Sequence, residues 1–237
     1  MNNTSIKVQN LTKIYNHNSN EKKGVFGLSF EVPKGSFHAF IGENGSGKTT
    51  TIKSIIGSYT NFSGQIYING IINSDPKSKA KLGYVPENAI FPKELNVFEY
   101  LYIVSLFGNK NKQQLKDKIN NFLEKFEISD LKKNKPNNLS SGQKKKVLLI
   151  QALLNDPDLI ILDEPAANLD PTARFKLFEI LSELNKQGKT IIISSHILSE
   201  IDKYATSYTL IHKGKLVSTG QKHKSLEDIY YEKIIQN

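Results

Sequence analysis

The chain has 237 residues, of which 38% are hydrophobic and 23% charged, and its formal net charge is +9. This size suits one large domain or one domain with a subdomain, and the composition is that of a folded rather than a disordered protein. The sequence has no cysteine, which excludes disulfides and thiolate metal sites. It has neither a signal-peptide profile nor an apolar run near the ~18 residues of a membrane span, so we expect a chain that is neither exported nor inserted.

The positive charge is concentrated in one segment. Between residues 110 and 146, eleven lysines stand against four acidic residues. Such a run is most often a solvated helix face; the alternatives are a surface near anionic lipid or a nucleic-acid contact. Arg174 is the only arginine in the chain, whereas the reading of bases favours arginine. We therefore expect no specific nucleic-acid partner.

The N-terminal third has the pattern of strands separated by turns. Strand-like runs cover residues 6–11, 25–32 and 64–68. Pro33-Lys34-Gly35 and Asn69-Gly70 are turn signals between them. We expect an antiparallel N-terminal β-subdomain.

A glycine-rich loop lies between a short apolar run at residues 37–41 and a predicted helix at residues 50–56, which is the strand–loop–helix setting of a phosphate-binding loop. Free backbone N–H groups and the positive end of a helix both favour an anion there. A chance match to this pattern has odds on the order of one per cent. The predicted nucleotide-binding residues are Gly42, Glu43, Asn44, Gly45, Ser46, Gly47, Lys48, Thr49 and Thr50.

Two side chains of this loop have distinct predicted roles. Lys48 can reach the β- and γ-phosphates, and the Thr49 hydroxyl can ligate Mg²⁺.

From residue 94 to residue 131, apolar residues recur at helical spacing, with a loop predicted at residues 109–111. A polar linker at residues 134–138 follows. We expect an inserted helical subdomain at residues 90–142, and a core made of residues 1–89 and 143–237.

A second polar, glycine-containing turn opens the helix predicted at residues 143–154. It consists of Ser140, Ser141, Gly142 and Gln143. Ser140 can cap this helix, and the N–H groups at its start form a possible second anion site. An ordinary helix cap explains the same residues, so the residues alone leave both interpretations open.

Two carboxylates follow the continuous apolar run at residues 159–162, which predicts a buried parallel strand. Parallel sheets bind ligands at the carboxyl ends of their strands. Asp163 is then placed to hold Mg²⁺, and Glu164 to polarise an attacking water. An acidic helix-entry turn before Pro165 is the less favoured interpretation beside a phosphate loop.

The remaining segments complete a parallel sheet. Asp170 and Pro171 predict the start of a helix that stops before Gly188. His196 follows a buried strand at residues 190–194 and can hydrogen-bond a γ-phosphate, although a lone histidine more often has no such role. Further strands are expected at residues 208–211 and 216–218. The predicted fold class is α/β, with a parallel-sheet ATP-binding core.

The order of these segments closely resembles the nucleotide-binding subunit of ATP-binding cassette (ABC) transporters, from about residue 5 to residue 220. Residues 139–143 are similar to the family signature Leu-Ser-Gly-Gly-Gln, with Ser141 where glycine is usual. The resemblance implies a P-loop NTPase fold of the ABC type. It also implies that Tyr15 stacks on adenine, that residues 167–170 form the loop with the dimer-contacting aspartate, and that His196 is the switch histidine.

The resemblance further implies a mechanism with ATP and Mg²⁺. Two cassettes, identical or different, face head to tail, and each ATP lies between the phosphate loop of one and residues 140–143 of the other. ATP closes the pair and hydrolysis reopens it. The chain would then be an ATPase that drives transport through a separate membrane permease, as a peripheral subunit on the cytoplasmic face of the cell membrane. The helical subdomain would dock on that permease, through Phe91, Leu95 and Val97.

Three features depart from the family pattern. Glu87 stands where the family usually has glutamine, and it can approach Mg²⁺ as an anion. The form Tyr84-Val85-Pro86-Glu87 resembles the branch of drug and peptide-antibiotic exporters, which favours export. Ser141 adds a side chain where close backbone approach is expected. Residues 144–146 are three lysines in a stretch where the family often has arginine.

The alternative is a non-transport ABC ATPase that acts on ribosomes or nucleic acid. Ribosomal members typically carry two cassettes, and chromosome-organising members insert a long coiled coil that the interval between residues 50 and 138 cannot hold. A GTPase is disfavoured because the chain has no Asn-Lys-x-Asp segment.

Overall fold

The structure is a computed structural model that describes residues 3–15, 23–88, 90–106 and 111–236. A four-stranded antiparallel sheet has the order β2-β1-β4-β5 and confirms the predicted N-terminal β-subdomain. Its strands are β1 (Thr4–Tyr15), β2 (Lys23–Pro33), β4 (Ser63–Ile68) and β5 (Ile71–Ile72).

The second sheet has the order β10-β9-β3-β8-β7-β6. All of its pairs are parallel except β10 with β9, which confirms the predicted parallel core. Its strands are β3 (Phe37–Ile41), β6 (Leu82–Val85), β7 (Leu159–Leu162), β8 (Thr190–Ser195), β9 (Ser207–His212) and β10 (Lys215–Gln221).

Most of the helices begin at a side-chain cap. Asn96 and Glu99 form a reciprocal capping box at the start of α2, and Asp170 caps α5, whose first residue is Pro171 as predicted. The helices are α1 (Lys48–Ile55), α2 (Val97–Ser105), α3 (Lys112–Lys125), α4 (Ser141–Leu153), α5 (Pro171–Lys186), α6 (Leu198–Asp202) and α7 (Leu226–Tyr230).

Short helical turns cover Pro76–Lys79, Ser129–Leu131, Pro136–Asn138 and Tyr231–Ile235. Within the described ranges, every helix falls short of the length and apolar character that a membrane crossing needs.

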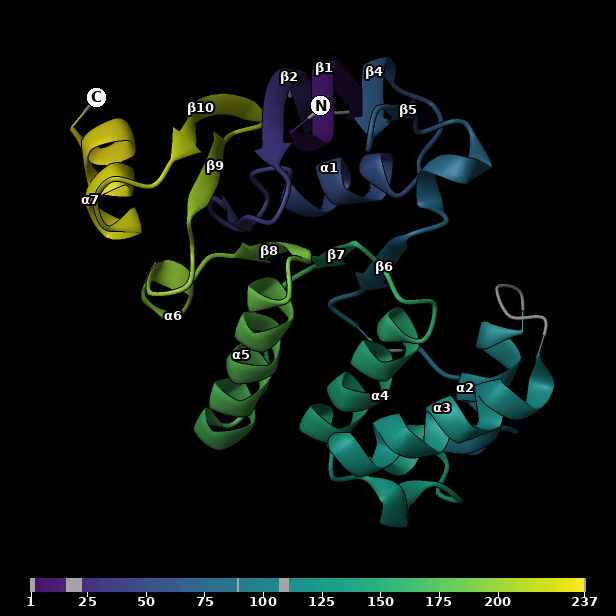
Figure 1. The fold of residues 1–237 in the computed structure, drawn as a ribbon. Coiled ribbons are helices and arrows are strands. Elements are labelled where there is room, and N and C mark those ends of the chain that lie inside the picture. The colour runs from purple at the N-terminus through teal and green to yellow at the C-terminus, as the bar shows by residue number, and fades with distance from the viewer. Residues whose placement is uncertain (1–2, 16–22, 89, 107–110, 237) are drawn as a thin grey trace.

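The parallel sheet lies between α1 with the antiparallel sheet on one face and helices α4 and α5 on the other (Figure 1). A hydrophobic core fills each side. On β7, Ile160 and Leu162 face the core beneath the helices, whereas Leu159 and Ile161 face the core shared with α1 and the antiparallel sheet. Strand residues alternate between faces, so a strand buried on both sides reads as a continuous apolar run. The apolar run at residues 159–162 therefore belongs to a strand that is buried on both faces of the sheet.

The helices α2 and α3 lie away from the two sheets, and α4 packs against both α2 and strand β6 (Figure 1). The predicted boundary between residues 142 and 143 falls inside α4, which begins at Ser141 because Ser140 caps it. One hydrophobic core runs from the parallel sheet through α4 into α2 and α3. Residues 139–143, called the signature segment below, are thus joined to the hydrophobic core by the continuous helix α4.

Candidate functional site

The glycine-rich loop turns from the end of β3 into the start of α1. Gly47 precedes the helix with φ of 107°. A Cβ at this position would lie 2.5 Å from Cγ1 of Val25 on β2, so a larger residue would have to shift the Val25 side chain and would also be strained at this positive φ. The turn leaves the N–H groups at the start of α1 available for an anion.

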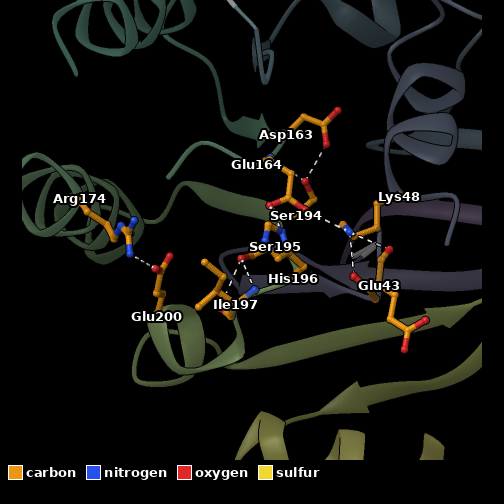
Figure 2. A network of polar contacts seen from close by, with 11 residues as sticks. Glu43, Lys48, Asp163, Glu164, Arg174, Ser194, Ser195, His196, Ile197 and Glu200 are labelled. Carbon is orange, nitrogen blue, oxygen red and sulfur yellow. Dashed lines mark hydrogen bonds and ion pairs between the residues drawn. The ribbon is translucent and has the colours of Figure 1, made fainter. Parts of the chain in front are cut away.

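Lys48 is the buried cation of this loop, with 5% of its surface exposed. Its Nζ donates hydrogen bonds to the carbonyl oxygens of Gly42 (2.8 Å) and Glu43 (3.2 Å). The same Nζ lies 3.1 Å from Oε1 of Glu164, as an ion pair without hydrogen-bond alignment (Figure 2). The phosphate loop and the acidic strand end therefore meet through one ammonium group.

Glu164 is held in an unusual backbone conformation, with φ of 42°. Its N–H donates to Oγ of Ser194 at 2.8 Å, and that hydroxyl donates to Oδ1 of Asp163 at 2.7 Å. Its Oε2 lies 3.0 Å from Nδ1 of His196 (Figure 2). Ser194, near the end of β8, and His196, directly after that strand, thus orient the two predicted carboxylates. A carboxylate held in place at the edge of a cavity suits a general base.

A cavity of about 430 Å³ lies over this cluster. It brings together most of the predicted nucleotide residues. The lining consists of Tyr15, Lys23, Gly24, Asn44, Gly45, Gly47, Lys48, Thr49, Thr50, Glu87, Glu164, Ala167 and His196. Gly42, Glu43, Ser46 and Asp163 are predicted site residues that do not line it.

Lys23 and Gly24 also line the cavity, although the sequence patterns did not point to them. Lys23 is the antiparallel partner of Tyr15 across β1 and β2. A strand pairing of this kind is the signal that could have identified Lys23, because it fixes which residue stands opposite the predicted adenine-stacking tyrosine.

Tyr15 lies at the edge of the cavity. Its hydroxyl is 3.0 Å from Oγ1 of Thr50, and its ring meets that of Tyr59 edge-on with centroids 6.2 Å apart. Burial raises the pKa of Tyr15, so the phenol stays neutral at physiological pH. A neutral aromatic ring bordering this cavity suits stacking with a nucleotide base.

The residues present fit a Mg²⁺-nucleotide. Oγ of Ser46 is buried and has no hydrogen-bond partner among the described residues. Thr49 and Glu87 contribute a hydroxyl and a carboxylate to the cavity, and Mg²⁺ prefers oxygen ligands of these kinds. Asp163 is buried behind Ser194, within the same network.

The signature segment contacts its own helix cap, the loop at Asn168 and the start of α5. Oγ of Ser140 accepts from N–H of Gln143 at 3.3 Å, and Oε1 of Gln143 accepts from N–H of Ser140 at 3.0 Å. Oγ of Ser141 donates to the carbonyl oxygen of Asn168 at 2.7 Å. A Cβ on Gly142 would lie 3.3 Å from Cβ of Ala173, which explains the glycine. None of residues 140–143 lines the cavity of its own chain.

The loop after β6 contacts the same helix. Nζ of Lys145 donates to the carbonyl oxygens of Pro86 (3.1 Å) and Glu87 (2.9 Å). Burial lowers the pKa of Lys145 to about 8, while the carboxylates of Glu87 and Asp163 favour its charged form.

Arg174 and Glu200 form an ion pair between α5 and α6 (Figure 2). Arg174 also donates to the carbonyl oxygen of Leu169, in the loop that follows Glu164. The loop at residues 167–170 is therefore fixed to α5.

The family model described as ABC transporter matches residues 25–167. The chain is 48% identical, over 85% of its length, to a Mycoplasma pneumoniae protein named as an ABC transporter ATP-binding protein, and it spans 62% of that protein's length. It is 31% identical to the ABC-type transporter ATP-binding protein EcsA of Bacillus subtilis, over 96% of this chain and 95% of that protein.

Among solved structures, the fold is similar to the dimeric post-hydrolysis ATP-binding cassette MJ0796 bound to ADP and Pi. The TM-score is 0.80 at 25% identity, covering 91% of this chain and 98% of that one. The family model, the relatives and the arrangement of Lys48, Glu164 and His196 agree: the chain belongs to the ABC transporter family, as an ATP-binding cassette of the kind that hydrolyses ATP.

Proposed function

We propose that this chain is the ATP-hydrolysing subunit of an ABC transporter, and that it powers a separate membrane permease by closing on a second cassette around ATP. One observation carries the proposal. Lys48, Glu164 and His196 form a single cluster beside the cavity, whereas residues 140–143 lie outside it. The cap uses the N–H groups of Ser140 and Gln143, whereas those of Ser141 and Gly142 have no acceptor among the hydrogen bonds of the described residues. A helix start with such N–H groups is what a second chain's phosphates would need.

The proposed chemistry follows from the contacts of Lys48 and Glu164. A bound triphosphate competes with the Glu164 carboxylate for the Lys48 ammonium, because both are anions within its reach. Once released from that pair, Glu164 is free to accept a proton from a water, and His196 on its other oxygen keeps the carboxylate oriented. ATP binding therefore prepares the base for hydrolysis.

Mg²⁺ would be held by Thr49 and Asp163, with Glu87 at the edge of the cavity. When bound, the ion neutralises charge that develops on the phosphates. The residues of this chain supply the oxygens and the buried network that orients them.

An ATP-binding cassette of this family would need two partners, a second cassette and a membrane permease. The second cassette is a copy of this chain or a related one, and the permease places the subunit at the cytoplasmic face of the membrane. Export is the proposed direction, supported by the resemblance of residues 84–87 to the exporter branch. The prediction that Phe91 and Val97 contact the permease is wrong, because both are buried and Phe91 packs against Tyr100 with ring centroids 5.0 Å apart. Leu95 is partly exposed, so the helical subdomain stays the proposed docking region with Leu95 as its candidate contact.

The composite site can be tested by cross-linking, because the chain has no native cysteine. Asn44 and Ser141 are both exposed, one on the phosphate loop and one on the signature segment. The double variant Asn44→Cys, Ser141→Cys should form covalent dimers with a short bismaleimide when ATP is added to a Glu164→Gln background. Each single-cysteine variant in the same background is the control and should form no covalent dimer. Dimers that form equally without ATP would contradict the proposal.

The transport role needs a second test. The tagged chain, purified from detergent-solubilised membranes of its source cells, should carry a multi-span protein with it. ATP hydrolysis by that complex should respond to the permease's substrate. A chain recovered only without any membrane protein, but bound to ribosomes, would favour the non-transport alternative.

A further inference from the structure

Three consecutive lysines at the start of α4 have different surroundings. Nζ of Lys146 donates to the carbonyl oxygen of Phe126, at the end of α3, at 2.7 Å. Lys145 is buried, with 7% of its surface exposed, and its Nζ donates to the carbonyl oxygens of Pro86 and Glu87. Lys146 therefore ties α4 to another helix of the same subdomain, whereas Lys145 ties it to the loop that leaves the parallel sheet.

That loop departs from the sheet where the strand pairing ends. The carbonyl oxygen of Val85 accepts from N–H of Asp163 at 2.9 Å, as part of the pairing between β6 and β7. Pro86 has no N–H to continue the ladder. The next two carbonyl oxygens, of Pro86 and Glu87, are the ones that Lys145 binds. Lys145 thus binds the loop at Pro86 and Glu87, the first two residues after the strand pairing ends.

The position of this clamp matters because the loop carries a group of the nucleotide site. Glu87 lines the cavity together with Lys48 and Glu164. Its main chain is bound by Lys145, and Lys145 stands five residues after Ser140, the cap of the signature helix. One ammonium therefore connects the wall of the cavity to the helix start proposed to contact the partner's phosphates.

We propose that Lys145 is a positioning residue for ATP hydrolysis: by clamping the backbone at Pro86 and Glu87 to α4, it holds the Glu87 carboxylate at the Mg²⁺ side of the cavity and moves it with the signature helix. The inference rests on the proposed nucleotide site. Burying an ammonium is costly unless it is hydrogen-bonded, and two backbone carbonyls at 2.9–3.1 Å supply that compensation.

Lys145→Met is the test variant, since it keeps the length of the side chain and removes its donors. Lys146→Met is the matched control. Lys146 is the next residue along α4, and its Nζ also donates to a carbonyl oxygen, that of Phe126, which lies outside the loop at residues 86–87. Lys145→Arg restores donors and a charge. All three are compared with the wild-type chain, without nucleotide and with MgATP.

The first measurement is hydrogen–deuterium exchange of the nucleotide-free chain. Peptides that contain Glu87 and Asn88 should exchange several-fold faster in Lys145→Met, and at the wild-type rate in Lys146→Met. This readout does not depend on ATP hydrolysis. It therefore stays informative even if the wild-type chain hydrolyses no ATP, an outcome that would defeat the proposed function and leave the clamp standing.

The second measurement is the dependence of hydrolysis on Mg²⁺. Because a hydrogen-bonded charged donor is lost, we expect kcat of Lys145→Met to fall about tenfold. The Mg²⁺ concentration for half-maximal rate should rise, while the Kd for ATP measured without Mg²⁺ stays within about twofold of wild type, since Lys48 is untouched. Lys145→Arg should recover most of the rate.

Two results would overturn the inference. One is wild-type exchange at Glu87 together with a wild-type Mg²⁺ dependence in Lys145→Met. The other is an equal fall in melting temperature in Lys145→Met and Lys146→Met with no change in Mg²⁺ dependence, which would make the contact merely structural. If Lys145→Met does not fold, Lys145→Leu, which also lacks a donor, is measured in its place against the same two criteria.

Discussion

The phosphate loop and the signature segment are both helix starts with glycine and serine, yet the structure treats them differently. Lys48, at the first start, is buried and bonded to groups from its own loop and from the end of β7. Ser140, at the second, is exposed and bonds only within its own helix cap. Similar local chemistry thus produces a completed pocket in one place and an open surface in the other.

The difference lies in what packs behind each helix start. Strand β8 brings Ser194 and His196 beside Glu164, so three segments of the chain converge on the phosphate loop. The signature segment is approached by the loop at Asn168, which accepts from Ser141, and by Ala173 on α5, and these neighbours bring no charged group to it. A single chain therefore holds the reacting groups together but leaves its second anion-binding surface facing outward. This asymmetry is what pairing with another cassette would use.

Glu164→Gln should have the largest effect on the completed pocket. Loss of the general base should lower kcat by about 10²–10⁴-fold, while the ATP-binding surface stays intact. The variant should accumulate as a closed dimer with ATP, measured by light scattering after gel filtration. Glu183→Gln, an exposed change on α5, is the control. A Glu164→Gln chain with wild-type turnover would remove this residue from the catalytic role.

Lys48→Ala should have the next largest effect. It removes the cation that faces the phosphates, so ATP affinity should weaken by about a hundredfold or more. Equilibrium binding of a fluorescent ATP analogue measures this, with Lys34→Ala on an exposed turn as the control. Unchanged affinity would show that the phosphates bind elsewhere.

The pH dependence of folding stability tests His38, which lies on β3, the strand that leads into the phosphate loop. His38, on β3, is fully buried between the hydroxyls of Ser207 and Thr209, each 2.9 Å away, and burial lowers its pKa to about 3. The unfolded chain takes up a proton near pH 6.5 whereas the folded chain does not, so stability is lost as the pH falls from about 6.5 toward 3.

Between pH 7 and pH 5 this histidine should remove about 2 kcal/mol of folding free energy. Urea unfolding at the two pH values measures the loss. His38→Gln should show a flatter dependence, and an equally steep one would assign the acid sensitivity to other groups.

Ser140→Ala should have the smallest effect. It tests the outward-facing signature segment directly. Loss of the cap should cost about 1 kcal/mol of stability. Hydrolysis should fall by about tenfold, through loss of a contact across the dimer, while ATP binding to the monomer is unchanged. Mixing this variant with Lys48→Ala should recover part of the activity if the two cassettes are identical, because one composite site is then intact. No fall in hydrolysis for Ser140→Ala alone would remove it from the site.

The sequence alone was enough for the motifs of the site that depend on short spacing. Neighbouring residues are enough to predict the phosphate loop, the strand that ends just before Asp163, and the caps at Ser140 and Asp170. A helix cap binds N–H groups two or three residues away, and ligands bind where parallel strands end. The helices α6 and α7 were not predicted, since each has five residues and is too short to show a helical period.

Tertiary structure decided which of these pieces meet. The pairing of Glu164 with His196 joins residues 32 apart, and the bonds of Lys145 to Pro86 and Glu87 join residues 59 and 58 apart. The placement of Lys23 opposite Tyr15 and the outward position of Ser140 likewise depend on packing. Local patterns determine which groups a segment offers, but burial against distant elements determines which partner each group finds, because a polar group taken out of water must be satisfied by whatever the fold brings beside it.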